Sequence, residues 1–237
     1  MVYKEIILKL RSLRSPKNVI GMARFGIKPK TKVYGVPIPE LRKIGKDLKG
    51  NPGKNHALAL KLWDSKIHEA RILAGYIAEV DKITESQMEK WVKGFDSWDV
   101  VDQVCSSCLD KTTFVYKKIF ELSKRRAEFE KRTAFTLIAC LSVHDKKMKD
   151  NKFIRFFPLI KKASIDERNF VKKAVNWALR QIGKRNVSLN IQSIKLAKEI
   201  LQLAISNNSK SAKWIASNAI TELSSEKVRQ RLKNKRK

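Results

Sequence analysis

Three groups of residues in this chain combine an acid, indole rings and arginines at spacings typical of one helix face. Trp98 precedes Asp102 by four residues, Trp177 precedes Arg180 by three, and Arg132 stands alone between the two pairs. Residues three or four apart lie on the same side of a helix. A carboxylate can stabilise positive charge on a reacting group, indole faces attract cations, and arginine binds phosphate. The set is therefore a candidate site for catalysis on a phosphate-bearing substrate.

Each group also has a purely structural interpretation. Trp98 could be a core residue with Asp102 solvated beside it, because tryptophan is highly buried on average. Arg132 could pack between helical repeats, and Trp177 could be a packed aromatic residue along which Arg180 extends its aliphatic stem. Asp102 fits this interpretation least well, because it lies among valines and an acid near an apolar face needs a partner.

The overall charge favours a polyanionic partner. The chain carries 52 Lys and Arg against 23 Asp and Glu, a formal net charge of +29. Solubility alone asks for a net charge of only about 2–8 in a small domain. We therefore expect nucleic acid as the partner, and not a membrane, since no concentrated amphipathic anchor is present. Arg180 is also a candidate for contact with the nucleic acid. The other candidates lie outside the three groups and are Arg24, Phe25, Lys28, Lys30, Lys173 and Lys213.

Apolar residues recur at helical spacing, and no alternating strand pattern is present. Residues 58–63 and 70–77 are predicted to be two helices separated by Asp64–Ser65. Similar segments return about every 30–40 residues, the period of HEAT and armadillo units, whose apolar faces are buried when neighbours stack. We therefore predict an all-α, HEAT-like or armadillo-type solenoid over residues 1–226, curved and with a basic concave face.

The two ends depart from this pattern. Glycine and proline cluster within residues 26–39 and 51–53, so residues 1–50 are predicted to form an irregular helical cap. Pro39 is expected in the first turn of a helix. Residues 227–237 are strongly basic and are interpreted as a tail, either frayed and self-repelling or in contact with phosphate.

Other kinds of site find little support. Zinc could take four ligands from Cys105, Cys108, Cys140 and His144, but these lie in apolar helical runs, so buried thiols are favoured and no metal is expected. No nucleotide-binding glycine loop is present, and no cofactor is expected. Three cysteines, the lack of about 20 consecutive apolar residues and the lack of a signal-peptide pattern predict a cytoplasmic protein.

Taken together, the chain resembles the AlkD-type DNA alkylation repair glycosylases, an all-helical HEAT-like family of bacteria and archaea. The resemblance covers nearly the whole chain and rests on Met22–Phe25, Gly35–Arg42, Leu62–Asp64, Ser97–Asp102, Arg132 and Ala174–Arg180. It implies a catalytic set made of an aspartate, two groove tryptophans and an arginine, which fall on Asp102, Trp98, Trp177 and Arg132.

This resemblance implies hydrolysis of the N-glycosidic bond of positively charged N3- and N7-alkylated purines in double-stranded DNA. Asp102 would stabilise the cationic sugar and orient a water, while the tryptophans would flank the sugar and Arg132 would hold phosphate. The family is taken to hold the duplex without a deep base pocket, and no insertion in the sequence would build one. Two departures bear on substrate range: Phe25 stands where family members can carry tyrosine, and Trp98 stands alone where related sequences can show paired tryptophans.

Two other functions fit the same sequence. A non-catalytic helical-repeat protein would bind nucleic acid without an acid at Asp102, and an adaptor would bind an acidic protein partner. Release of free base from alkylated duplex distinguishes the enzyme from the binding protein. We expect a monomer, located in the cytoplasm and associated with the nucleoid when bound to DNA.

Overall fold

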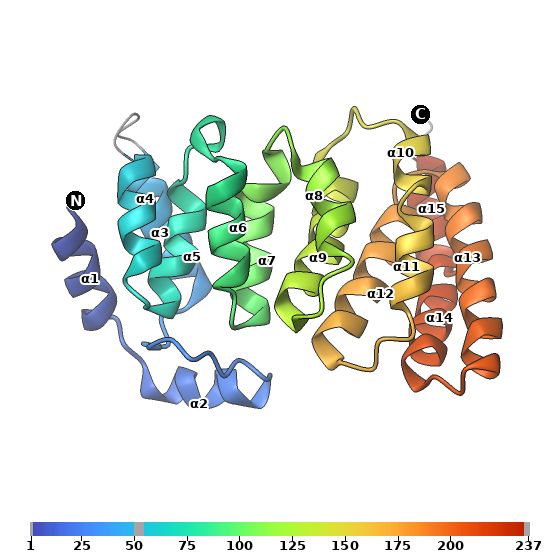
Figure 1. The fold of residues 1–237 in the computed structure, drawn as a ribbon, viewed down its shortest axis with the longest axis horizontal. Coiled ribbons are helices and arrows are strands. Elements are labelled where there is room, and N and C mark those ends of the chain that lie inside the picture. The colour runs from blue at the N-terminus through green and yellow to red at the C-terminus, as the bar shows by residue number, and fades with distance from the viewer. Residues whose placement is uncertain (1, 50–54, 235–237) are drawn as a thin grey trace. The chain divides into compact units, whose positions relative to one another are not determined.

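Helices make up the regular structure of this protein (Figure 1). The computed structural model describes residues 2–49 and 55–234, and no strand occurs within them. In these ranges the one β-type contact is an isolated parallel bridge between Lys32 and Ile67. The predicted all-α class is therefore confirmed, because apolar residues that repeat every three or four positions can share a buried face only in a helix.

The helices form two compact units, of which unit 1 spans Met1–Val115. Its helices are α1 Tyr3–Ser12, α2 Pro16–Arg24, α3 Ile38–Lys49, α4 Asn55–Asp64, α5 His68–Ile77, α6 Glu85–Lys93 and α7 Trp98–Ser107, with 3-10 turns at Val80–Lys82 and Leu109–Lys111. Helices α4 and α5 form the predicted helix–turn–helix, and the turn follows Asp64 as expected. Helix α5 is central, because it packs against α3, α4 and α7.

Unit 2 spans Tyr116–Lys237. Its helices are α8 Val115–Leu122, α9 Glu128–His144, α10 Asp150–Ile154, α11 Phe157–Ala163, α12 Asn169–Gly183, α13 Val187–Ser206, α14 Lys210–Leu223 and α15 Glu226–Asn234. Helix α12 packs against α9, α13 and α14 and is the centre of this unit. Stacked helical pairs of this kind bury the apolar face that no single pair could bury alone.

Carboxylates from neighbouring helices and loops accept backbone N–H groups at helix N-termini and in loops. In unit 1, Glu79 accepts the first backbone N–H groups of α4, and Glu69 accepts those of residues 34–36 at 2.6–3.3 Å. In unit 2, Glu128 accepts the N–H of Phe170 and Glu167 accepts that of Ser211. Helix N-termini expose N–H groups without intrahelical partners, so these acids stabilise the joints between repeats.

The N-terminal segment is irregular as predicted, whereas much of the predicted basic tail is a helix. Residues up to Lys49 form α1, α2 and α3 with a long irregular segment before Pro39, which lies in the first turn of α3 as expected. The basic segment that follows residue 226 is helix α15 as far as Asn234, with Val228 and Leu232 buried, because two apolar side chains dock it. Residues 51–53 and the last three basic residues of the expected tail lie outside the described residues. Among the helices that are described, none combines the length and apolarity needed to span a bilayer.

Candidate functional site

Helix α7 presents the first predicted pair of site residues. It begins at Trp98, directly after Ser97, and Asp102 lies one turn further along. Both side chains are half-buried, so Trp98 is not the core residue of the structural interpretation. The Trp98 Nε1–H donates to the carbonyl oxygen of Phe25 at 3.1 Å, which ties α7 to the end of α2. Ser97 is the N-cap residue of α7, but its hydroxyl donates to the carboxylate of Asp99 and caps no backbone N–H group.

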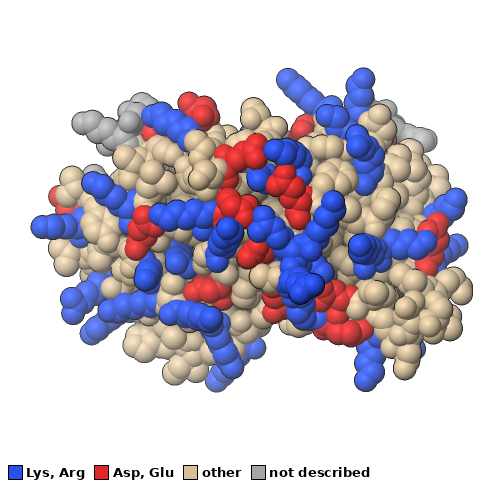
Figure 2. Space-filling view, viewed as in Figure 1, with Lys and Arg blue, Asp and Glu red and all other residues tan. Residues whose placement is uncertain are grey.

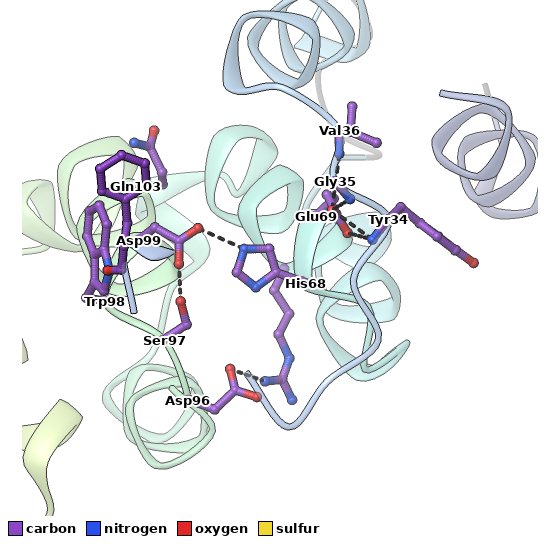
Figure 3. A network of polar contacts seen from close by, with 12 residues as sticks. Tyr34, Gly35, Val36, His68, Glu69, Asp96, Ser97, Trp98, Asp99 and Gln103 are labelled. Atoms are coloured by element: carbon purple, nitrogen blue, oxygen red, sulfur yellow. Dashed lines mark hydrogen bonds and ion pairs between the residues drawn. The ribbon is translucent and has the colours of Figure 1, made fainter. Parts of the chain in front are cut away.

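An ion pair that the sequence analysis missed lies behind Trp98 (Figure 3). His68 of α5 and Asp99 of α7 approach at 2.8 Å between Nε2 and Oδ2, and their side chains are only 1% and 11% exposed. Burial lowers the pKa of His68, but the hydrogen bond and charge of Asp99 outweigh it and raise that pKa above 6.5. Burial raises the pKa of Asp99, and His68 and Ser97 bring it below 3.8. Each group thus favours the charged form of the other, and the pair anchors the first turn of α7 to α5.

A second buried charge, Arg71, lies one turn after His68 on α5. Its guanidinium donates to the carbonyl of Gly94 at 2.8 Å, lies 3.6 Å from the carboxylate of Asp96 and covers the ring of Trp63. Asp96 in turn accepts the backbone N–H of Thr31 at 3.1 Å. The segment before α7 is thus bound both to α5 and to the loop after α2. The sequence contains a signal for these buried contacts, because the ionisable side chains of a His-Glu-x-Arg run inside an apolar helix require buried partners.

A cavity of about 860 Å³ opens beside α2 and is called the α2 cavity below. Residues of α2, of the segment 35–38, of α5 and of α7 line it, among them Gly21, His68, Trp98 and Gln103. Helix α2 buries none of its own residues, so it covers the cavity without packing tightly on unit 1. That the duplex is held without a deep base pocket stays a prediction. No inserted segment forms this cavity, because the loosely packed helix α2 forms one of its walls.

The predicted contacts on and after α2 are all open to solvent. Arg24, Lys28 and Lys30 are exposed, and Phe25 is 74% exposed although it is aromatic. A DNA contact by these four residues stays a prediction, but their positions allow it.

The predicted site residues of unit 2 are bound more closely within their own unit. Arg132 on α9 is 4% exposed and donates to the carbonyl of Phe170 at 2.7 Å, which is the packing role of the structural interpretation. Arg180 on α12 is half-buried and pairs with Glu222 on α14, which Lys184 also contacts. Trp177 is half-buried on α12. That Arg132 and Trp177 share a site with Trp98 and Asp102 stays a prediction.

The remaining basic candidates are exposed side chains. Lys173 on α12 and Lys213 on α14 both face solvent. On the face drawn in Figure 2, Lys and Arg side chains are spread widely and Asp and Glu side chains lie among them. The predicted concentration of basic residues on one concave face stays a prediction.

The cysteines are buried thiols. Cys105, Cys108 and Cys140 are all buried, and burial raises the pKa of the Cys108 thiol to about 12. Within the described ranges, no group of three or more His, Cys, Asp or Glu side chains has the arrangement of a metal site. A protonated, inaccessible thiol is a poor ligand and a poor nucleophile, which counts against the zinc alternative.

Comparisons with known proteins agree with this architecture. The model of the family described as DNA alkylation repair enzyme matches residues 6–223. A curated relative, the uncharacterized protein Lmo0209 of Listeria monocytogenes serovar 1/2a, is 28% identical over 112 residues, 47% of this chain and 49% of that protein. The match thus spans about half the length of this relative.

One solved structure also matches, and its description is a new family of proteins related to the HEAT-like repeat DNA glycosylases with affinity for branched DNA structures. The TM-score is 0.72 and the identity 20%, over 84% of this chain and 83% of that one. At this identity the likeness shows the fold alone, which is a HEAT-like helical-repeat fold.

Proposed function

The chain belongs to the DNA alkylation repair enzyme family, and from this premise we propose that it is a DNA glycosylase acting on N3- and N7-alkylated purines in duplex DNA. The observation that carries this proposal is the outward face of α7. Trp98 and Asp102 lie there one turn apart and half-buried, and the exposed cation Arg24 lies next to Phe25, to which Trp98 is bonded. A duplex bound through such cations would bring its backbone to the Asp102 carboxylate.

The alkylated base is already a good leaving group. Alkylation at N3 or N7 gives the purine a positive charge, so the base leaves neutral when its bond to C1′ breaks and the electron pair moves to the base nitrogen. The positive charge passes to the sugar. The carboxylate of Asp102 would stabilise this cation and accept a proton from the water whose oxygen bonds to C1′. The ring face of Trp98 would attract the cationic nucleotide before the bond breaks.

The unit 2 residues enter this proposal in secondary roles. Trp177, which is half-buried, would flank the sugar–phosphate backbone. Arg132 would hold phosphate only if it released the Phe170 carbonyl that it binds. We therefore rank both below Trp98 and Asp102 as carriers of the reaction.

Excision by the Asp102→Asn variant tests the proposal most directly. Asparagine keeps the size of the side chain but removes the negative charge, so we expect release of N7-methylguanine from duplex DNA to fall by about 100-fold or more. Affinity for the duplex should stay within about threefold. Free base is measured by chromatography in single-turnover reactions.

Asp81→Asn is the matched control, because Asp81 is an exposed carboxylate of the 3-10 turn before α6 and its loss changes the net charge equally. This control should excise like the parent. Equal excision by the parent and Asp102→Asn would refute the role of Asp102.

A non-catalytic DNA-binding function is the second candidate. It is supported by the solved structure of a glycosylase-related family with affinity for branched DNA. The parent protein would then release no base, and it would bind a four-way junction more tightly than a duplex of the same length at the same salt concentration.

A further inference from the structure

Three aromatic side chains lie at the end of unit 2 where α9, α12 and α14 begin (Figure 1). Helix α12 packs against both α9 and α14, so the first turns of the three helices are neighbours. Phe129 lies in the first turn of α9, Phe170 in the first turn of α12 and Trp214 in the second turn of α14. These three side chains are called the aromatic row below.

Direct contacts join the members of the aromatic row. The rings of Phe129 and Phe170 are stacked, with centroids 5.5 Å apart and an angle of 28° between their planes. The ammonium of Lys172, two residues after Phe170, lies 5.5 Å from the centre of the Trp214 ring. The row therefore runs from α9 across α12 to α14.

Trp214 differs from the tryptophans that serve packing alone. In unit 1, Trp63 and Trp91 stack on each other at 4.7 Å and are 3% and 0% exposed. Trp214 is 41% exposed, and no aromatic ring of the described residues stacks on it. Its ring is therefore open to a stacking partner from outside the chain.

The acids close to the row are bound within the protein, whereas several cations extend into solvent. Glu128 and Glu167 each accept a backbone N–H at the N-terminus of a helix. Glu130 and Asp166 each pair with a basic side chain. The exposed cations at this end of unit 2 are Arg126, Lys173, Lys210 and Lys213. They can bind phosphates, since the nearby acids already have partners.

We propose that this surface binds single-stranded DNA, with unpaired bases stacked on the aromatic row and phosphates bound by the exposed cations. Proteins that bind single strands combine a positively charged track with aromatic side chains on which successive bases stack. A paired duplex fits the row less well, because neighbouring base pairs cover the faces of its bases. The inference goes beyond the proposed base excision and does not depend on it.

Two strands of equal length test the stacking. We would measure dissociation constants by fluorescence anisotropy for a thymidine strand of about 12 nucleotides and for a strand of abasic units, which keeps the phosphates but has no bases. The parent should bind the thymidine strand about tenfold more tightly or better, since each stacked base adds affinity. Equal affinities for the two strands would overturn the proposal.

Substitution of Trp214 places the stacking on the row. Trp214→Leu keeps an apolar side chain without a ring face, so the preference for the thymidine strand should fall by about fivefold or more. Its affinity for a paired duplex of the same length should not change. Trp214→Phe is the matched control, because it restores a ring, and it should keep most of the preference. A Trp214→Leu variant that keeps the full preference, or weakens duplex binding by the same factor, would overturn the proposal.

Lys213→Ala tests the phosphate contacts of the same surface. The slope of log affinity for the thymidine strand against log salt concentration should fall by about 0.7, the value for one phosphate contact on a single strand. Lys195→Ala is the control, because Lys195 is an exposed lysine of α13 outside the row, and it should leave the slope unchanged. Equal changes of slope in the two variants would mean that the strand does not follow the row.

Discussion

The arginines predicted as site residues are held differently in unit 1 and in unit 2. In unit 1, Arg24 and Phe25 extend into solvent beside the half-buried Trp98. In unit 2, Arg132 is 4% exposed and bound to a backbone carbonyl, while Arg180 is paired with Glu222. Residue type is therefore a poor guide to role when the partner is unknown.

The two units also contain ion pairs that differ in burial. The His68–Asp99 pair of unit 1 is almost completely enclosed, whereas Lys161 and Glu199 of unit 2 form a pair with both side chains 43% exposed. The enclosed pair anchors the helix that carries the candidate site. The exposed pair joins α11 to α13, but water screens it.

The largest effect is expected from breaking the enclosed pair. His68→Leu leaves the Asp99 carboxylate buried without its cation, so the free energy of unfolding should fall by about 3–5 kcal/mol. Urea unfolding followed by circular dichroism measures the loss. Lys161→Ala is the control and should cost less than about 1 kcal/mol. Equal losses for the two variants would mean that the pair contributes no more than a surface contact.

The pH dependence of the same variant identifies the pair. Because Asp99 raises the pKa of His68 above 6.5, the stabilisation by His68 is complete below about pH 6.5 and is lost as the pH rises through the raised pKa. Because the pKa of Asp99 is lowered from 3.8, its stabilisation is complete above that value and is lost as the pH falls through the lowered pKa. The parent should therefore lose stability toward alkaline pH by a contribution that His68→Leu lacks.

A smaller effect on stability is expected at Arg132. Arg132→Met removes the guanidinium that donates to the carbonyl of Phe170, which should lower the free energy of unfolding by about 1–3 kcal/mol. The slope of log affinity for DNA against log salt concentration should not change, because the guanidinium is buried. A slope reduced by about 1 would instead show that Arg132 contacts a phosphate.

The smallest effect on stability is expected at Arg24. Arg24→Ala removes an exposed side chain at the end of α2, so the free energy of unfolding should change by no more than about 0.5 kcal/mol. The salt slope of DNA binding should fall by about 1, as expected for one phosphate contact. Arg180→Ala is the comparison from unit 2. It should lower the free energy of unfolding more than Arg24→Ala does, and it should leave the salt slope of DNA binding unchanged. If both variants left the slope unchanged, neither arginine would contact DNA.

Local patterns in the chain were enough to predict the helices and the class of fold. The turn after Asp64, the helix start near Pro39 and the shared face of Trp98 and Asp102 all depend on residues within a few positions of each other. The candidate status of Asp102 came from the same source, since an acid among valines is visible without a fold.

Only the tertiary structure determined which distant residues contact each other. His68 and Asp99 are 31 residues apart, and Arg132 and Phe170 are 38 apart. Periodicity says which face of a helix is buried but not which helix covers it, so neither pair could be assigned from spacing. The α2 cavity escaped prediction for the same reason, because it is formed where a helix packs loosely on its neighbours. Whether a helix packs loosely or tightly depends on side chains from several elements at once.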